Sequence, residues 1–137
     1  MLVNAMLSPG IPVMFVEEAF QKQENLLFLD CREKAEYDVS HLPGTLWIGY
    51  SDFELSRLQN IHTSTDIVVY CSVGKRSDVM TKRLMAANYT NVKNLVGGLF
   101  EWANQGYAVY KGCEQTDDVH VYNRSWGRWL KRGNKIY

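Results

Sequence analysis

The fold is decided by the segment Ile67-Val68-Val69-Tyr70-Cys71-Ser72-Val73-Gly74-Lys75-Arg76-Ser77. Its apolar first residues predict a buried strand, and the chain after it has the apolar spacing of an amphipathic helix. A cysteine between a strand and a helix meets backbone N–H groups and the positive end of the helix dipole, which together stabilise a thiolate and a bound anion. Lys75 and Arg76 add positive charge. We therefore interpret Cys71 as a nucleophile on an exposed loop.

Strand-like and helix-like stretches alternate along the chain, which predicts a parallel sheet with helices on both faces. The predicted strands are residues 13–15, 26–30, 45–48, 67–70 and 92–96. The predicted helices are residues 16–23, 34–38, 51 or 52 to 58, 77–87 and 99–105. Ser77 is expected to cap its helix, and Asn88 to end that helix in a left-handed conformation.

Length, charge and composition narrow the class of protein. The chain has 137 residues, 46% of them hydrophobic, and a formal net charge of zero. Such a chain fits one folded domain, and its neutrality argues against binding to nucleic acid or to an anionic membrane. It contains no apolar run long enough to span a bilayer, and its first residues lack the basic residue of a secretory signal. We expect a soluble cytoplasmic protein.

Three widely spaced cysteines, Cys31, Cys71 and Cys113, do not form a disulfide framework. No C-x-x-C pair is present and the three histidines are scattered, so a metal site is not expected. Thiol chemistry without a metal or cofactor, in a reducing compartment, fits this pattern. Cys31 could serve as a resolving thiol, but a small buried hydrophobic residue at a strand end is the favoured interpretation.

The composition changes after Gly112 and sets residues 112–137 apart as a C-terminal extension. Residues 113–118 are polar and acidic, which predicts a linker. Residues 121–137 carry five cations and no acidic residue, interleaved with Trp126 and Trp129. The extension either packs its tryptophans on the preceding domain or docks an acidic partner or a nucleic acid. Tryptophans three residues apart favour packing.

Four segments of the chain resemble those of the rhodanese-like sulfurtransferase family. Residues 30–37 resemble its D-x-R-x-x-x-E-[FY] segment, and residues 41–45 resemble H-[IL]-P-G-A with threonine in the last place. Residues 68–77 resemble the active-site strand and loop, and residues 95–102 resemble the closing L-x-G-G-x-x-x-W. The four segments occur in the family's order, so the chain is identified as a member over residues 30–102.

The resemblance implies a three-layer α/β/α sandwich on a five-stranded parallel sheet for residues 12–111. The fourth strand would be central with the second beside it, so Cys71 would lie at the carboxyl edge of the sheet, where open α/β folds bind ligands. Asp30 and Arg32 would then be neighbours of the loop. A structural ion pair between these two residues and a substrate contact by Arg32 are equally supported at this point.

The resemblance also implies a sulfurtransferase that works through a persulfide on Cys71. Its partners would be a small anionic donor such as thiosulfate and an acceptor such as cyanide, an organic thiol or a protein thiol. Lys75 and Arg76 would attract the anionic group of the donor. The substrate-binding loop would supply backbone N–H groups to the terminal sulfur; it comprises Ser72, Val73, Gly74, Lys75, Arg76 and Ser77.

Two other functions remain open for the loop. A cysteine phosphatase uses a related loop with arginine in the seventh place counted from the cysteine, whereas Arg76 is sixth. The shorter loop favours a sulfur atom over a phosphoryl group. A binding module, or a persulfide relay to a protein partner, would keep the fold and use the C-terminal extension as its docking element. Retention of Cys71 with both cations argues against a module that has lost its chemistry.

Overall fold

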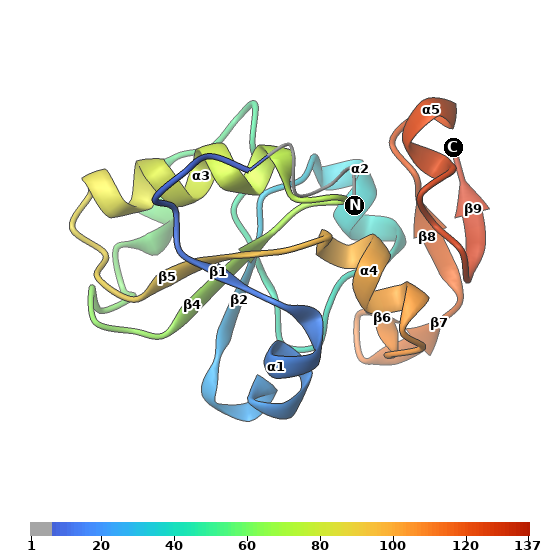
Figure 1. Ribbon diagram of the computed structural model, residues 1–137, viewed down its shortest axis with the longest axis horizontal. Helices are drawn as coiled ribbons and strands as arrows, with labels where there is room; N and C mark the ends of the chain where they lie inside the picture. The colour runs from blue at the N-terminus through green and yellow to red at the C-terminus, as the bar shows by residue number, and fades with distance from the viewer. Residues whose placement is uncertain (1–6) are drawn as a thin grey trace.

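A five-stranded parallel sheet forms the centre of the protein, whose computed structural model describes residues 7–137 (Figure 1). The strand order is β1-β5-β4-β2-β3. The strands are β1 (Val13–Met14), β2 (Leu27–Asp30), β3 (Leu46–Trp47), β4 (Ile67–Tyr70) and β5 (Val92–Leu95). The predicted α/β class is confirmed, with the fourth strand in the centre and the second strand beside it.

The register of the two central strands places the functional loop. Leu27 pairs with Ile67 and Asp30 pairs with Tyr70, so β2 and β4 end at the same edge of the sheet. Cys31 and Cys71 follow directly, and the Cys31 N–H donates to the Tyr70 carbonyl at 3.1 Å. Both cysteines therefore stand side by side at the carboxyl edge.

Helices cover both faces of the sheet because the central strands β2 and β4 carry apolar side chains on both faces. They are α1 (Val16–Gln21), α2 (Lys34–Val39), α3 (Lys75–Ala86) and α4 (Gly98–Asn104), with 3₁₀ turns η2 (Gln23–Asn25) and η3 (Leu55–Leu58). Phe28 and Val68 face α1 and α4, whereas Leu29 and Val69 face α3. Figure 1 shows α3 on one side of the sheet and α1 with α4 on the other.

The predicted helix that ends at residue 58 is only the short turn η3, so that prediction is wrong in extent. Neither Ser51 nor Asp52 caps it, because the turn begins after Glu54. The N–H and hydroxyl of Ser51 instead donate to the Glu33 carboxylate at 3.2 and 3.1 Å. These two hydrogen bonds tie the loop around Ser51 to Glu33, at the start of α2.

The C-terminal segment adds two small sheets and a short helix. Its elements are β6 (Val109–Lys111), β7 (Glu114–Thr116), β8 (Asp118–His120), α5 (Arg124–Gly127) and β9 (Asn134–Ile136). The predicted linker over residues 113–118 is wrong, because residues 114–116 form β7, which pairs antiparallel with β6 after a turn at Gly112, and β8 begins at Asp118. β8 and β9 pair in parallel, and α2 packs against β8.

This extension shares the main core. Val119, Val121 and Leu130 are fully or almost fully buried in the same apolar cluster as α4. Trp126 and Trp129 are half-buried against that cluster. The segment after residue 112 is therefore in direct contact with the domain that precedes it.

Neither a membrane-spanning helix nor a cluster of metal-ligating side chains occurs within residues 7–137. The longest helix, α3, has 12 residues, and no helix in this range has the length and apolar character of a bilayer-spanning segment. No three histidine, cysteine, aspartate or glutamate side chains in the same range gather as metal ligands would.

Candidate active site

The Cys71 sulfur lies at the N-terminus of α3. Gly74 adopts φ +112°, which favours glycine, and turns the chain so that its own N–H donates to Cys71 Sγ at 3.1 Å. The next three amides, of Lys75, Arg76 and Ser77, belong to the first turn of α3, where N–H groups have no partner within the helix. Of the predicted loop, the Gly74 N–H contacts the Cys71 sulfur directly, and the cradle of N–H groups from residues 72–77 stays a prediction.

Ser77 lies within α3 rather than at its cap, because the helix begins at Lys75, and the capping prediction is wrong. Its hydroxyl is 3.4 Å from Cys71 Sγ and donates to Asn94 Oδ1. Asn94 in turn donates from Nδ2 to the Gly74 carbonyl at 3.1 Å. Ser77 and Asn94 thus tie the start of α3 to β5, the strand beside β4.

The start of α4 fixes the other side of the loop. The N–H groups of Leu99 and Phe100 donate to the carbonyls of Cys71 and Ser72 at 2.9 and 3.0 Å. This contact requires glycine at position 98, where φ is +61° and a Cβ atom would be 2.4 Å from the Cys71 carbonyl oxygen. The Gly97-Gly98 pair of the sequence therefore serves the geometry of the cysteine loop.

Arg76 makes a bidentate ion pair with Glu36 of α2. Nη1 and Nη2 donate to the two carboxylate oxygens at 2.8 and 3.0 Å, and Nη2 also donates to Ser72 Oγ at 3.1 Å. The Ser72 hydroxyl donates to the same carboxylate at 3.2 Å, and so does the Glu33 N–H at 2.9 Å. Sequence reasoning missed this role of Glu36, although the residue belongs to a matched family segment.

Charge around Arg76 is reflected in two pKa shifts. Burial alone would lower the pKa of Arg76, but its hydrogen bond to Glu36 and the charge of the Cys71 thiolate raise it. Burial alone would raise the pKa of Glu36, yet hydrogen bonding and attraction to Arg76 hold it below 4.5. Both groups are therefore charged at neutral pH.

Lys75 and Arg76 occupy different environments, although the sequence places them together. Lys75 is exposed and forms no salt bridge among residues 7–137. Arg76 is 7% exposed, and its guanidinium lies 4.5 Å from the centre of the Tyr122 ring and 5.9 Å from that of Trp126. The C-terminal segment thus reaches the active-site loop, which the sequence did not predict.

Asp30 and Arg32 form a fully buried ion pair. Arg32 Nη2 is 2.7 Å from Asp30 Oδ2 and also donates to the Ser40 carbonyl at 2.6 Å. The Tyr70 hydroxyl donates to the same aspartate at 3.1 Å. Both charged side chains are 0% exposed, which favours the structural interpretation over a substrate contact by Arg32.

A known protein family and solved structures are similar to this chain over most of its length. Residues 16–105 match the family described as the rhodanese-like domain. The chain belongs to the rhodanese-like domain family. A solution structure of the rhodanese-like domain of Alr3790 from Anabaena sp. is 21% identical, has a TM-score of 0.67, and covers 92% of this chain and 89% of its own. At 21% identity, this solution structure supports the fold of the chain and nothing further.

Two curated relatives of this rhodanese-like domain have names that concern sulfur. YrkF of Bacillus subtilis (strain 168), named as a candidate sulfur carrier protein, is 28% identical over 102 residues, which is 74% of this chain and 55% of YrkF. A sulfurtransferase of Allochromatium vinosum is 33% identical over 86 residues, which is 63% of this chain and 79% of that protein. The chain spans about half the length of YrkF. The names of these two relatives thus describe sulfur carriage and sulfur transfer.

The three cysteines of the chain have different exposures. All are free; Cys31 and Cys71 are 0% exposed, whereas Cys113 is exposed. Burial, with a contribution from the neighbouring Cys71, raises the pKa of Cys31 well above its ordinary value, so Cys31 stays a thiol. The prediction of an exposed loop is wrong, since residues 71–74 are all buried under neighbouring elements.

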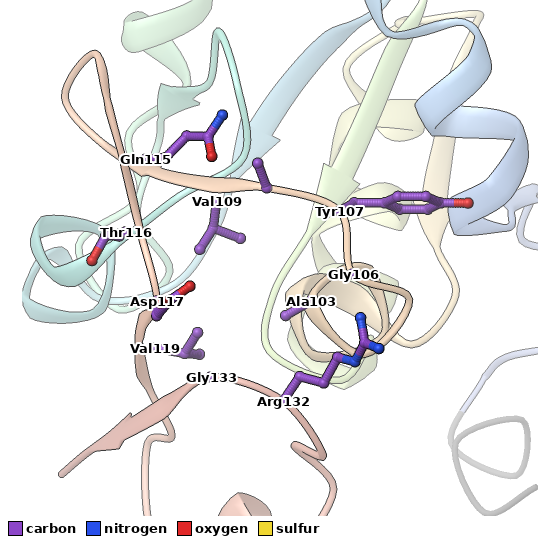
Figure 2. Close-up of a pocket in the computed structure, with 11 residues that line it drawn as sticks. Ala103, Gly106, Tyr107, Val109, Gln115, Thr116, Asp117, Val119, Arg132 and Gly133 are labelled. Carbon is purple, nitrogen blue, oxygen red and sulfur yellow. The ribbon is translucent and has the colours of Figure 1, made fainter.

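Two cavities flank the C-terminal segment of the chain. One, of about 340 Å³, touches the cysteine loop at Lys75 and Arg76 and is also lined by Tyr122 and Trp126. The other, of about 240 Å³, lies between the end of α4 and strands β6 to β8, and Figure 2 shows Arg132 extending along it. Of these two cavities, only the first borders the Cys71 loop.

Proposed function

We propose that this protein transfers sulfane sulfur through a persulfide on Cys71, with thiosulfate or a related anion as the donor. The Cys71 thiolate attacks the outer sulfur of thiosulfate, the S–S bond of the donor breaks, and sulfite leaves with the electron pair. An acceptor nucleophile, such as cyanide or a thiolate, then attacks the outer persulfide sulfur and releases Cys71 as a thiolate. No oxidant or metal is needed for either step.

The observation that carries this proposal is the position of Sγ against the first turn of α3. The sulfur already accepts from the Gly74 N–H at 3.1 Å, and three further amides of that turn lack partners within the helix. A persulfide adds one anionic sulfur atom, which those amides and the helix dipole would stabilise. The loop therefore has to accommodate only one additional atom, the outer sulfur of the persulfide.

The donor's sulfonate group is expected to bind Lys75. Arg76 is engaged by Glu36 and Ser72, so its charge is already compensated within the protein. Lys75 is the exposed cation of the same helical turn and lines the cavity beside the loop. We therefore assign donor attraction mainly to Lys75, and the holding of the loop to Arg76.

The cellular setting also belongs to the proposal. A thiolate nucleophile that must be regenerated in each cycle works best where thiols stay reduced, and all three cysteines are free. We infer a reducing compartment such as the cytoplasm. The donor and acceptor are small molecules or protein thiols, without a nucleic acid or a membrane as partner.

Steady-state transfer from thiosulfate to cyanide tests the proposed function. Cys71→Ala is expected to abolish turnover, whereas Cys113→Ala, which removes the exposed thiol, is expected to retain it. Lys75→Met is expected to raise the KM for thiosulfate about tenfold, as expected for one lost charge contact in a partly desolvated site. Turnover that survives in Cys71→Ala would contradict the proposal. Hydrolysis of an aryl phosphate that is lost in Cys71→Ser would favour the phosphatase instead.

A further inference from the structure

The cavity beside the active-site loop is built by parts of the chain that are far apart in sequence. α3 contributes Lys75, Arg76 and Val79, the C-terminal segment contributes Tyr122 and Trp126, and the remaining wall is Glu33, Tyr50 and Ser51. At about 340 Å³ it has the size of the smaller small-molecule sites. It is larger than thiosulfate or cyanide requires, so the size of the small substrates does not account for it.

The aromatic wall is held in place by backbone strain and local hydrogen bonds. Tyr122 has φ +69°, an uncommon conformation for a residue with a bulky side chain, and its N–H donates to His120 Nδ1 at 3.0 Å. Val121 before it is fully buried, and Asn123 after it accepts from the Trp126 N–H at 2.8 Å. Such strain persists only where surrounding structure enforces it, and here it directs the ring toward Arg76.

Tyr122 is nevertheless 45% exposed. Its ring lies 5.3 Å from the Trp126 ring, at an angle of 49°. The two rings therefore present an apolar surface to the cavity rather than completing the core. An exposed aromatic pair beside a nucleophile's loop is suited to contact the carbon skeleton of a substrate.

The charged groups of the cavity are of both signs. The Arg76 charge is compensated by Glu36, which leaves the Lys75 ammonium as the uncompensated cation of the wall. Glu33 supplies a half-buried carboxylate that accepts two bonds from Ser51 and meets no cation within salt-bridge distance among residues 7–137. An exposed cation, a carboxylate without a counter-charge among residues 7–137 and an aromatic surface match a molecule with a carboxylate, an ammonium and a carbon chain.

We propose that this cavity binds the sulfur acceptor and that Tyr122 and Trp126 select an amino-acid or peptide thiol over a small inorganic acceptor. The inference rests on the proposed function, because it names the substrate of the second half-reaction. The acceptor's carboxylate lies toward Lys75, its ammonium toward Glu33, and its carbon chain against the rings. Its thiolate attacks the outer persulfide sulfur, the Cys71 S–S bond breaks, and the products are an organic persulfide and the Cys71 thiolate.

Competition between acceptors tests the selection. With thiosulfate as donor, kcat/KM is measured for glutathione, cysteine and cyanide, and for 2-mercaptoethanol as an uncharged thiol at matched thiolate concentration. We expect Tyr122→Ala to lower the ratio of the glutathione value to the cyanide value about tenfold. Tyr122→Phe is expected to keep the ratio because it keeps the ring. Tyr137→Ala is the matched control, since Tyr137 also lies over an arginine, Arg124 at 4.7 Å, but outside the cavity.

A ratio that stays constant in Tyr122→Ala would overturn the inference, because the ring would then only support Arg76 and affect both acceptors alike. An equal fall in Tyr137→Ala would overturn it as well. In the wild type, 2-mercaptoethanol as efficient as cysteine would contradict the role of the charges.

Binding without chemistry separates this inference from the proposed function. S-methylglutathione cannot accept sulfur, so it is titrated into Cys71→Ser protein while the indole N–H resonance of Trp126 is followed by NMR, assigned with Trp126→Phe. We expect saturable shifts that are weakened at least about tenfold in Tyr122→Ala. No saturable shift would overturn the inference, even if Cys71 forms a persulfide. Saturable binding of S-methylglutathione without persulfide formation on Cys71 would contradict the proposed function but not binding at this cavity.

Discussion

Arg76 and Glu36, 40 residues apart in sequence, form a bidentate ion pair at the side of the Cys71 loop, with N–O distances of 2.8 and 3.0 Å. The pair joins the first turn of α3 to α2, and Ser72 bridges both side chains. The two side chains are 9% and 2% exposed. The conformation of the Cys71 loop therefore depends on Glu36, a residue of α2.

Glu36→Gln is predicted to destabilise the protein. The substitution keeps the shape of the side chain but leaves the buried Arg76 guanidinium without its counter-charge, which costs about 3 kcal/mol in comparable buried pairs. Equilibrium unfolding in urea measures the change in the free energy of unfolding. Glu17→Gln, an exposed residue of α1, is the control and should change it by less than about 0.5 kcal/mol. Equal effects of the two variants would contradict this role for Glu36.

The same ion pair predicts an acid-dependent loss of stability. Burial alone would raise the pKa of Glu36, but Arg76 holds it below the ordinary value of 4.5. A carboxylate with a lowered pKa contributes stability at pH values above 4.5, and that contribution is lost as the pH falls through the pKa of the folded state. The free energy of unfolding should therefore decline more steeply below pH 4.5 in the wild type than in Glu36→Gln. Parallel pH profiles of the free energy of unfolding in the two proteins would contradict this prediction.

Gly98→Ala is predicted to damage both stability and sulfur transfer. Its Cβ would come within 2.4 and 2.7 Å of the carbonyl oxygens of Cys71 and Ser72, which α4 binds. Gly112→Ala is a matched control, because φ is +63° there but no atom lies within 4 Å. The control should cost about 1–2 kcal/mol from backbone strain, and Gly98→Ala at least about 2 kcal/mol more, with loss of turnover. Thermal unfolding and the thiosulfate assay measure these effects.

Much of this site follows from the sequence because its determinants are local. The apolar run before Cys71 has the length and composition of a buried strand, and β4 occupies residues 67–70 as predicted. The glycine and the two cations after the cysteine specify a tight turn into a helix. Asn88 likewise ends α3 with φ +72°, as predicted. Each of these features depends on residues within a few positions of one another.

The unpredicted parts depend on contacts between distant segments. Glu36 has the pattern of an ordinary helix residue, and its pairing with Arg76 exists only once β2 and β4 are neighbours. Burial of the loop similarly depends on the start of α4, which donates to the carbonyls of Cys71 and Ser72. The strand over residues 114–116 escaped prediction because its side chains are mostly exposed and polar, so it carries no apolar alternation.

Alkylation should distinguish the three cysteines of the native protein. Cys113 is exposed and should react first with iodoacetamide. Cys71 is buried but faces the amides of α3 and Arg76, so it should follow. Cys31 should react last, because burial raises its pKa well above the ordinary value. Peptide mass spectrometry over a time course gives the order, and labelling of Cys31 before Cys71 would contradict it.

The central claim is that Cys71 carries the sulfur, and the mass of the thiosulfate-treated protein tests it most directly. After treatment and removal of excess thiosulfate, intact mass and peptide mapping are compared for the wild type, Cys71→Ser and Cys113→Ala. We expect an increase of about 32 Da, one sulfur atom, on the Cys71 peptide of the wild type and Cys113→Ala. We expect none in Cys71→Ser. An adduct on Cys113, or no adduct on Cys71, would contradict the account.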